Sequence, residues 1–261
     1  MTLIGSAVAH AAGTSPEARW RKVAAETDGV VGAAALHLKS GERFALNGDE
    51  RFPLASVCKL PIAMNILAMV DEGKPALNQE IEVLPRDVWA GVSEIEKRWP
   101  AQRRFALNET IELMIAQSDN TAVETLFRIG GEGRAMVARF REWKIDGVRV
   151  DRSERQCNLD RNGVEHYPPP GEWTDEKIDA PIARTTAEMR YRATQRFLKD
   201  PRDTGTPNGT VQLPARVFRG EVLSKTSTAR LIEALKATTG DDCRAQDGLG
   251  GWGERAERGD Q

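Results

Sequence analysis

Residues 52–64 read Phe52-Pro-Leu-Ala-Ser-Val-Cys-Lys-Leu-Pro-Ile-Ala-Met64, which predicts an extended segment followed by an apolar helix. Pro53 fixes its own φ and pushes Phe52 out of the α region, so the approach to the helix is extended. Apolar residues then recur at helical spacing, at Val57, Leu60, Ile62, Ala63, Ile66, Leu67 and Val70. Ser56 is therefore expected at the helix N-terminus, with Lys59 one turn further along the same face.

This pairing of a hydroxyl with an amine has a chemical and a purely structural interpretation. A serine at a helix N-terminus lies at the positive end of the helix dipole. An amine one turn away can take its proton where burial lowers the pKa of the amine. Ser56 could equally be a helix cap and Lys59 a solvated side chain. Because Ser-x-x-Lys recurs by chance, the tetrapeptide alone favours the structural interpretation.

Length and charge restrict the class of protein. A chain of 261 residues is long enough for one or two domains with a large core. The net charge of -2 offers no basic patch of the kind that nucleic-acid binding needs, so no nucleic-acid partner is expected. No apolar run is long enough to cross a bilayer, and we expect no membrane span.

The cysteines and histidines show no spacing that is typical of a metal site or a disulfide framework. They are Cys58, Cys157, Cys243, His10, His37 and His166. Three cysteines cannot all pair, and Cys58 falls on the apolar helix, where a small core residue is expected rather than a reactive thiol. We expect no metal site, and no histidine stands in a context that suits a Ser-His-Asp triad.

The remaining pattern predicts a mainly helical chain with one β-hairpin, which pairs residues 30–39 with residues 42–47. Helices are expected at 18–27, 56–70, from a cap at Asn108 to the Ser118-Asp119-Asn120 stop, and at 121–129, 132–143, 186–199, 207–218 and 224–238. The helix at 186–199 follows a capping-box pattern at 185–188. Residues 81–99 and 157–181 are expected to be rich in loops, the second because of its prolines, glycines and charges.

The two ends of the sequence differ from its middle. Residues 1–14 carry small residues of the A-x-A type without a basic region, which is typical of an export-signal remnant or of a frayed end. Residues 241–261 are rich in glycine and charge, which indicates a disordered tail or a sequence that has departed from its parent reading frame.

Three further motifs accompany Ser56-x-x-Lys59. They are Ser118-Asp119-Asn120 at a predicted helix end, Glu154 and Asn158 within the predicted loop at 150–158, and Asp203-Thr-Gly-Thr-Pro207 at a helix start. Ser-x-x-Lys and Ser-Asp-Asn are together a signature of penicillin-recognising serine enzymes. In this order, and with Gly130-Gly131 between them, the motifs resemble the class A serine β-lactamases over residues 30–240.

The resemblance implies an α/β (α+β) fold of the β-lactamase/transpeptidase type, with a helical subdomain beside an antiparallel sheet flanked by helices. Residues 15–240 would form the catalytic domain. The implied function is hydrolysis of β-lactam antibiotics, conferring resistance, by a monomer that needs no cofactor and works in the bacterial periplasm or outside the cell. A penicillin-binding or D,D-peptidase-type protein and an inactive β-lactamase remnant are the alternatives.

The resemblance also implies roles in the acylation half of the reaction. Ser56 would be the acylated nucleophile, because a β-lactam carbonyl is opened by a deprotonated serine. Lys59 would hydrogen-bond to Ser56 and activate it. Ser118 would pass a proton to the departing lactam nitrogen. Whether Lys59 or Glu154 removes the serine proton is disputed for the family.

Deacylation and substrate binding would use a second set of residues. Glu154, helped by Asn158, would hold and deprotonate the hydrolytic water, because the ester needs a carboxylate base beside it. The purely structural interpretation of Glu154 is a residue that forms a salt bridge on an exposed loop. Asn120 would bind the side-chain amide of the substrate. Trp89 would flank the mouth of the site, although a core tryptophan is at least as compatible with the sequence.

Two departures from the family pattern affect the Ω loop, which Arg152 and Asp203 would pin at its ends. The segment between them is longer than usual, and Glu124 stands where most members have asparagine. The hypothesis that follows is a wide active-site mouth that admits bulky cephalosporins.

This sequence also departs from the family pattern in its C-terminal part. The resembling enzymes carry Lys-Thr-Gly on a strand, then two more strands and a helix, and this sequence shows none of these. The last three sheet strands and the C-terminal helix are expected to be missing, which leaves a marginal two-stranded sheet. The missing strand would provide one oxyanion donor, whose loss costs about 3–4 kcal/mol of barrier. We expect little or no activity from the chain as written.

Overall fold

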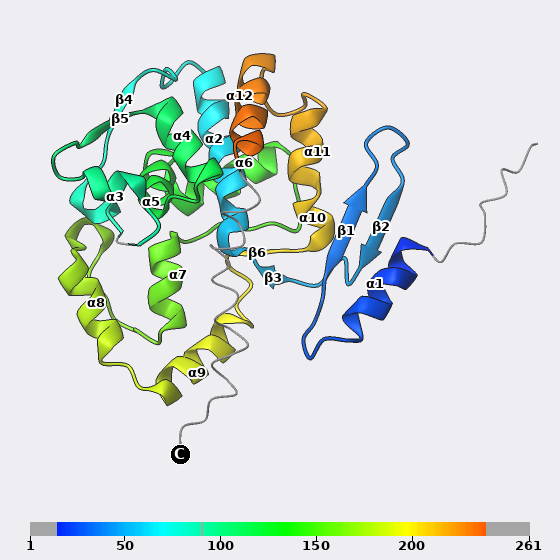
Figure 1. The fold of residues 1–261 in the computed structure, drawn as a ribbon, viewed down its shortest axis with the longest axis horizontal. Helices are drawn as coiled ribbons and strands as arrows, with labels where there is room; N and C mark the ends of the chain where they lie inside the picture. The colour runs from blue at the N-terminus through cyan, green and yellow to red at the C-terminus, as the bar shows by residue number, and fades with distance from the viewer. Residues whose placement is uncertain (1–14, 90, 239–261) are drawn as a thin grey trace, which may run out of the picture.

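Helices dominate the computed structural model, which describes residues 15–89 and 91–238 (Figure 1). They are α1 Pro16–Ala24, α2 Lys59–Asp71, α3 Glu94–Arg98, α4 Leu107–Ala116, α5 Asn120–Ile129, α6 Glu132–Glu142, α7 Glu154–Arg161, α8 Asp175–Ala183, α9 Ala187–Phe197, α10 Pro207–Thr210, α11 Gln212–Phe218 and α12 Lys225–Lys236. Short 3₁₀ helices are η1 Ala55–Cys58, η2 Pro85–Asp87 and η3 Pro170–Glu172. The expectations for residues 1–14 and 241–261 lie outside the described residues.

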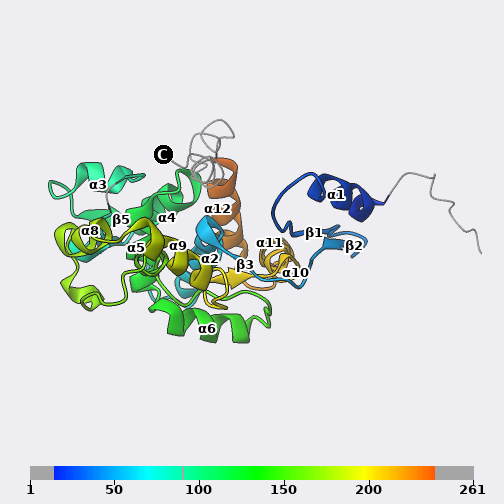
Figure 2. The same cartoon turned by 90° about the horizontal axis from the view of Figure 1, so that it is seen from below.

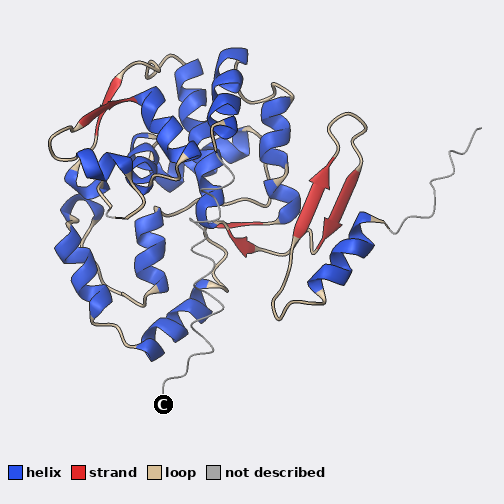
Figure 3. Cartoon of the chain, in the orientation of Figure 1, coloured by secondary structure: helices blue, strands red, loops and turns tan. Residues whose placement is uncertain are grey.

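The strands form small antiparallel pairs, drawn in red in Figure 3. They are β1 Ala33–Leu36 with β2 Arg43–Leu46, β3 Phe52–Pro53 with β6 Thr204–Gly205, and β4 Glu80–Glu82 with β5 Arg104–Ala106. In the first pair Ala33 lies opposite Leu46 and Leu36 opposite Arg43, which matches the predicted hairpin. The described residues therefore show an α+β fold with a truncated sheet, as the resemblance implied.

Helix α2 is the centre of the main helical body. It is apolar on all sides, which is typical of a helix buried on all sides, and it packs against α4, α5, α6 and α12. Ile62, Ile66 and Leu67 are buried almost completely. Lys59 is the first residue of α2, so the buried residues that fix α2 in the core also fix the position of Lys59.

Helix α1 and the β1–β2 hairpin, here called the hairpin unit, lie to one side of the helical body (Figures 1 and 2). Helix α1 contacts β2, and α10 contacts β1. No residue of α1 is buried, and Leu46 is the only buried residue of the described chain before Leu54. The hairpin unit therefore shares little of the core.

Serine side chains cap the first and the last of the described helices. Ser15 accepts a hydrogen bond at the start of α1, and Ser224 does the same for α12. The predicted cap at Asn108 is wrong, because α4 begins at Leu107 and Ala106 holds the cap position. Strand β5 runs directly into α4, and its pairing with β4 sets the path of the chain at that point.

Two segments predicted to be rich in loops contain regular structure. Residues 81–99 hold part of β4, η2 and α3. Residues 157–181 hold most of α7 and α8, with Pro181 inside α8. The signal for α8 is its cap, Thr174, whose hydroxyl accepts from Lys177 N. For α9 the cap is Thr186, one residue after the predicted capping box begins. The prolines of residues 157–181 favoured the prediction of a loop over the weaker signals of these short, capped helices.

Candidate active site

Lys59 brings four of the predicted site residues together. Its Nζ donates to Ser118 Oγ at 2.6 Å, to Ser56 Oγ at 3.2 Å and to Asn120 Oδ1 at 3.3 Å. Glu154 Oε1 lies 3.7 Å from the same nitrogen. The side chain of Lys59 is 5% exposed and that of Glu154 is 18% exposed, so the interaction is largely shielded from solvent. Three segments far apart in the sequence thus meet at one cation.

The turn η1 presents Ser56 directly above the start of α2. Strand β3 leads into η1. Leu54 N donates to the carbonyl oxygen of Asp203 at 2.9 Å, so the segment before η1 is held against the residue that precedes β6. Ala55 has a φ of 44°, in the left-handed region that non-glycine residues rarely adopt. Such strain persists where the surroundings enforce it and is common at functional sites. Ser56 is exposed while Lys59 beneath it is buried.

Asp119 orders the Ser118-Asp119-Asn120 segment, a role that the sequence motif alone did not reveal. Its carboxylate accepts from Ser93 Oγ, Glu94 N, Ile95 N and Ala122 N at 2.7–3.0 Å. It therefore caps the N-termini of both α3 and α5. Ser118, with a φ of 58°, turns the chain at this point, and its side chain faces Lys59.

Glu154 is the first residue of α7 rather than part of a loop, which corrects the prediction for residues 150–158. Ser153 and Gln156 form a capping box: Ser153 Oγ accepts from Gln156 N at 3.2 Å, and Gln156 Oε1 accepts from Ser153 N at 3.0 Å. The Ser-x-x-Gln spacing was available in the sequence as a helix signal. An anionic side chain at a helix N-terminus is stabilised by the helix dipole.

Cys58 contacts the same carboxylate oxygen as Lys59. Its Sγ donates to Glu154 Oε1 at 3.4 Å. Burial and the neighbouring Glu154 carboxylate raise the pKa of the Cys58 thiol well above its usual value, so the thiol keeps its proton. Cys58 is buried, as predicted, and Cys58 and Cys157 are both free thiols.

Comparisons with known proteins identify the family of the chain. The Beta-lactamase enzyme family model matches residues 15–257. Beta-lactamase VEB-1 of Pseudomonas aeruginosa is 24% identical over 217 residues, 81% of this chain and 71% of the relative. Beta-lactamase L2 of Stenotrophomonas maltophilia is 27% identical over 216 residues, 82% of this chain and 59% of the relative. An ancestral class A β-lactamase structure aligns with a TM-score of 0.66 and 26% identity, over 88% of this chain and 74% of that one.

The chain belongs to the β-lactamase enzyme family. Its relatives and structural neighbours support membership of class A, which confirms the resemblance drawn from the motifs. A β-lactamase from Chitinophaga pinensis shares the fold with a TM-score of 0.66 at 24% identity.

Arg152 and Asp203 form the ion pair that was predicted for the ends of the Ω loop. Arg152 Nε lies 2.6 Å from Asp203 Oδ2, while Asp203 Oδ1 accepts from Asp151 N and Arg152 N. The Arg152 guanidinium also contacts Asp160 and Asp200. Both ends of the segment that carries α7, α8 and α9 are therefore fastened at one buried cation.

The hydrogen bonds of the Asn158 side chain and of the Trp89 backbone do not reach Lys59. Asn158 Oδ1 accepts from Arg161 Nη2 and Asn162 Nδ2, so these bonds remain within α7 and its end. Trp89 N donates at 3.1 Å to Oγ1 of Thr121, which is the residue after Asn120. Trp89 is half-buried. The predicted roles of Asn158 and Trp89 stay predictions.

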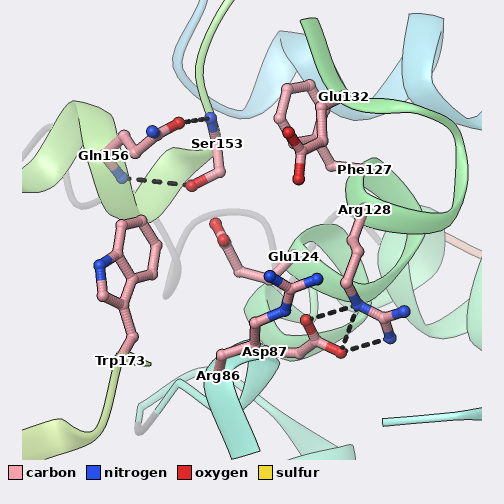
Figure 4. A pocket seen from close by; sticks show the side chains of 9 residues that line it. All are labelled: Arg86, Asp87, Glu124, Phe127, Arg128, Glu132, Ser153, Gln156 and Trp173. Carbon is pink, nitrogen blue, oxygen red and sulfur yellow. Dashed lines mark hydrogen bonds and ion pairs between the residues drawn. The ribbon is translucent and has the colours of Figure 1, made fainter. Parts of the chain in front are cut away.

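Glu124 lies behind the N-terminus of α7. It is 6% exposed, and its Oε1 accepts from Arg155 N at 2.9 Å. Burial raises the pKa of Glu124 to about 7, against the opposing effect of its hydrogen bonds from Arg155 and Ser153. Figure 4 shows its carboxyl pointing into a small cavity of about 40 Å³. The cavity is lined by Arg86, Asp87, Glu124, Phe127, Arg128, Glu132, Ser153, Gln156 and Trp173.

The described residues contain no candidate metal site and no candidate membrane span. Within residues 15–89 and 91–238, no group of three or more histidine, cysteine, aspartate or glutamate side chains is arranged to hold a metal ion. None of the helices described is both long and apolar enough to cross a membrane.

Proposed function

We propose that this chain opens β-lactams through an acyl-enzyme on Ser56, in a single catalytic domain over residues 15–240. The observation that carries the proposal is the meeting of Ser56, Ser118, Asn120 and Glu154 at the Nζ of Lys59. A nucleophile, a proton carrier and a carboxylate that share one cation form the constellation that acyl transfer followed by hydrolysis requires. The β-lactamase relatives favour the same chemistry.

In the acylation step, Ser56 Oγ attacks the lactam carbonyl carbon and loses its proton as the new ester bond forms. The proton of Ser56 passes to Lys59 Nζ, 3.2 Å away, which first gives one of its own protons to Glu154 Oε1 and regains it once Ser118 has been replenished. The lactam C–N bond breaks, and the nitrogen takes a proton from Ser118 Oγ, which Lys59 contacts at 2.6 Å and replenishes. Atoms and charge balance without a cofactor.

In the deacylation step, Glu154 removes a proton from water, whose oxygen attacks the ester carbonyl. The ester bond to Ser56 Oγ then breaks, and Ser56 recovers a proton. Glu154 Oε1 is held by Cys58 at 3.4 Å and by Lys59 at 3.7 Å. We assign Asn158, one turn along α7 from Glu154, as its helper in placing that water.

Asn120 and Trp89 would bind the substrate, Asn120 through its amide and Trp89 beside the mouth of the site. The segment between Arg152 and Asp203 contains α8 and α9 in addition to α7. We propose that this long segment widens the mouth and favours bulky cephalosporins over benzylpenicillin. Equal or slower hydrolysis of the bulky substrates would contradict this.

We further propose that the chain acts as a monomer in the periplasm or outside the cell, where β-lactams reach their targets.

Turnover of β-lactams by this chain is expected to be slow. The sequence contains no Lys-Thr-Gly, and removing a single oxyanion donor lowers kcat by about 10²–10³ in other hydrolases.

The test is to incubate the chain with a labelled penicillin and to follow the mass of the intact protein, with nitrocefin turnover measured alongside. A transient adduct that is absent from Ser56→Ala and persistent in Glu154→Gln supports the proposal. A persistent adduct on the unaltered chain would indicate a penicillin-binding type of protein. No adduct at all would indicate a family member without this activity.

A further inference from the structure

Glu154 meets the rest of the site through one of its two carboxylate oxygens. Oε1 lies 3.7 Å from Lys59 Nζ, and the Cys58 thiol donates to the same oxygen at 3.4 Å. Oε2 accepts no hydrogen bond from any residue that the structure describes, and it is not one of the buried polar atoms that lack a partner. Because the Glu154 side chain is 18% exposed, solvent reaches Oε2. The two oxygens of this carboxylate are therefore not equivalent.

Cys58 is held firmly on the side of the nucleophile. It ends η1, two residues after Ser56, and occupies the N-cap position of α2. Its side chain is 7% exposed and belongs to the main hydrophobic core, which also contains Ile62 of the next turn of α2. A thiol anchored in a packed core has little freedom to follow a moving carboxylate. The contact therefore sets where Glu154 Oε1 lies relative to the turn that carries Ser56.

The side chain of Glu154 needs such a contact to have a fixed orientation. The capping box at the start of α7 fixes the backbone of Glu154 but leaves its side-chain torsions free. Lys59 is a poor anchor, because the three N–H donors of an ammonium are shared here among four nearer oxygens at 2.6–3.3 Å. Among the described residues, only Cys58 donates a hydrogen bond to the carboxylate.

A thiol suits this position because it holds a carboxylate without neutralising it. The S–H group is a weak hydrogen-bond donor, so it fixes Oε1 while leaving most of the negative charge available to take up a proton. Burial and the neighbouring Glu154 raise the pKa of the Cys58 thiol, so the sulfur keeps its proton and adds no second negative charge.

We propose that Cys58 is a positioning residue that holds Glu154 Oε1 beside Lys59 and leaves Oε2 as the oxygen that removes a proton from water. Oε1 exchanges a proton with Lys59 during acylation. During deacylation an O–H bond of water breaks, its proton passes to Oε2, and its oxygen bonds to the ester carbonyl carbon. The ester bond then breaks, and the proton returns to Ser56 Oγ. This assignment rests on the proposed function of the site and gives each oxygen a separate task.

The first measurement needs no substrate. The S–H stretching band of Cys58 is isolated as the infrared difference between the unaltered chain and Cys58→Ser. A thiol that donates to a carboxylate absorbs at lower frequency than a free thiol, so the band should move to higher frequency in Glu154→Ala and part of the way in Glu154→Gln. Cys157→Ser removes the other described free thiol and should leave the band unchanged. A band that stays at the same frequency in both Glu154 variants would overturn the proposal.

The second measurement separates hydrogen-bond donation from packing. Formation and decay of the adduct on Ser56 are followed with a labelled penicillin, by the mass of the intact protein. Cys58→Val fills the space of the thiol without a donor, and we expect deacylation to slow about tenfold and acylation to slow less, since a 1 Å misplacement can cost roughly 10²-fold. Cys58→Ser keeps a donor and should recover most of that loss. Cys58→Ala replaces the valine variant if the latter does not fold.

The results distinguish a failure of this proposal from a failure of the proposed function. Equal slowing in Cys58→Val and Cys58→Ser, or an unchanged adduct lifetime in Cys58→Val, would refute the positioning role alone. Absence of any adduct on Ser56 would refute the proposed function, while the S–H band would still report whether Cys58 holds Glu154.

Discussion

The helical body and the hairpin unit differ in how they are held. The body surrounds α2, whose residues Ile62 to Ala68 are all buried, and it supplies every described contact of Lys59. The hairpin unit, formed by α1, β1 and β2, contributes Leu46 as its one buried side chain and leaves Val23, Val30 and Leu38 exposed. A catalytic constellation can therefore be formed within the body while the neighbouring sheet remains incomplete.

The largest expected effect is on chemistry within the body. Lys59→Ala removes the group that Ser56, Ser118 and Glu154 share, so we expect acylation of Ser56 to slow by about 10³-fold. The rate of adduct formation with a labelled penicillin measures this. Lys74→Ala, at an exposed ion pair beyond the end of α2, should leave the rate unchanged. An equal loss in both variants would refute the assignment of Lys59.

The next effect concerns the buried pair that fastens α7. Arg152→Leu leaves Asp203 buried and unpaired, which should lower the free energy of unfolding by about 3–5 kcal/mol. Denaturant titration measures the loss. Arg149→Leu is the control, because the Arg149–Asp151 pair lies at the surface and should be worth less than about 1 kcal/mol. A comparable small loss in both would show that the segment is held by other contacts.

A direct comparison of the two regions uses one apolar truncation in each. Ile66→Ala in α2 leaves a cavity in the core, and we expect a loss of about 2–5 kcal/mol in the free energy of unfolding. Leu36→Ala in β1 removes a half-buried side chain and should cost about 1 kcal/mol. Equal losses, measured by denaturant titration, would contradict the view that the hairpin unit lies outside the core.

The smallest expected effect is electrostatic and lies at the end of α2. Hydrogen bonds from Arg139 and Lys74 lower the pKa of Glu72 to about 2. The stabilisation is therefore complete above pH 4.5 and is lost as the pH falls through about 2. Because Glu72 is about one-third exposed, solvent screening should limit the loss in Glu72→Gln to about 1 kcal/mol at neutral pH. A loss that persists at the lowest pH would argue for a packing effect.

Much of the site was predictable because its residues stand in short motifs. Ser56-x-x-Lys59 is set by helical geometry, and the structure places its two groups 3.2 Å apart. The Ser118-Asp119-Asn120 segment and Glu154 were named from the same family pattern, and the structure brings them to Lys59. The hairpin of residues 30–39 with 42–47 was predicted, and the structure pairs β1 with β2 within these ranges.

Other features were not predictable from local pattern. Helices α7 and α8 were taken for loop because proline and charge outweigh two short caps, at Ser153 and Thr174. The function of Asp119 as a cap for two helices depends on α3, which lies 25 residues earlier in the chain and becomes its neighbour only on folding. The bond of Cys58 to Glu154 joins residues 96 positions apart.

The sequence by itself determined the central apolar helix, the serine and lysine at its start, and the family, because periodicity and motif spacing are local properties of a chain. Only the tertiary structure decided that Glu154 meets Lys59 and that Glu124 supports α7 from behind. Burial and proximity between distant segments set those contacts and the pKa of Glu124, and neither quantity exists before the chain has folded.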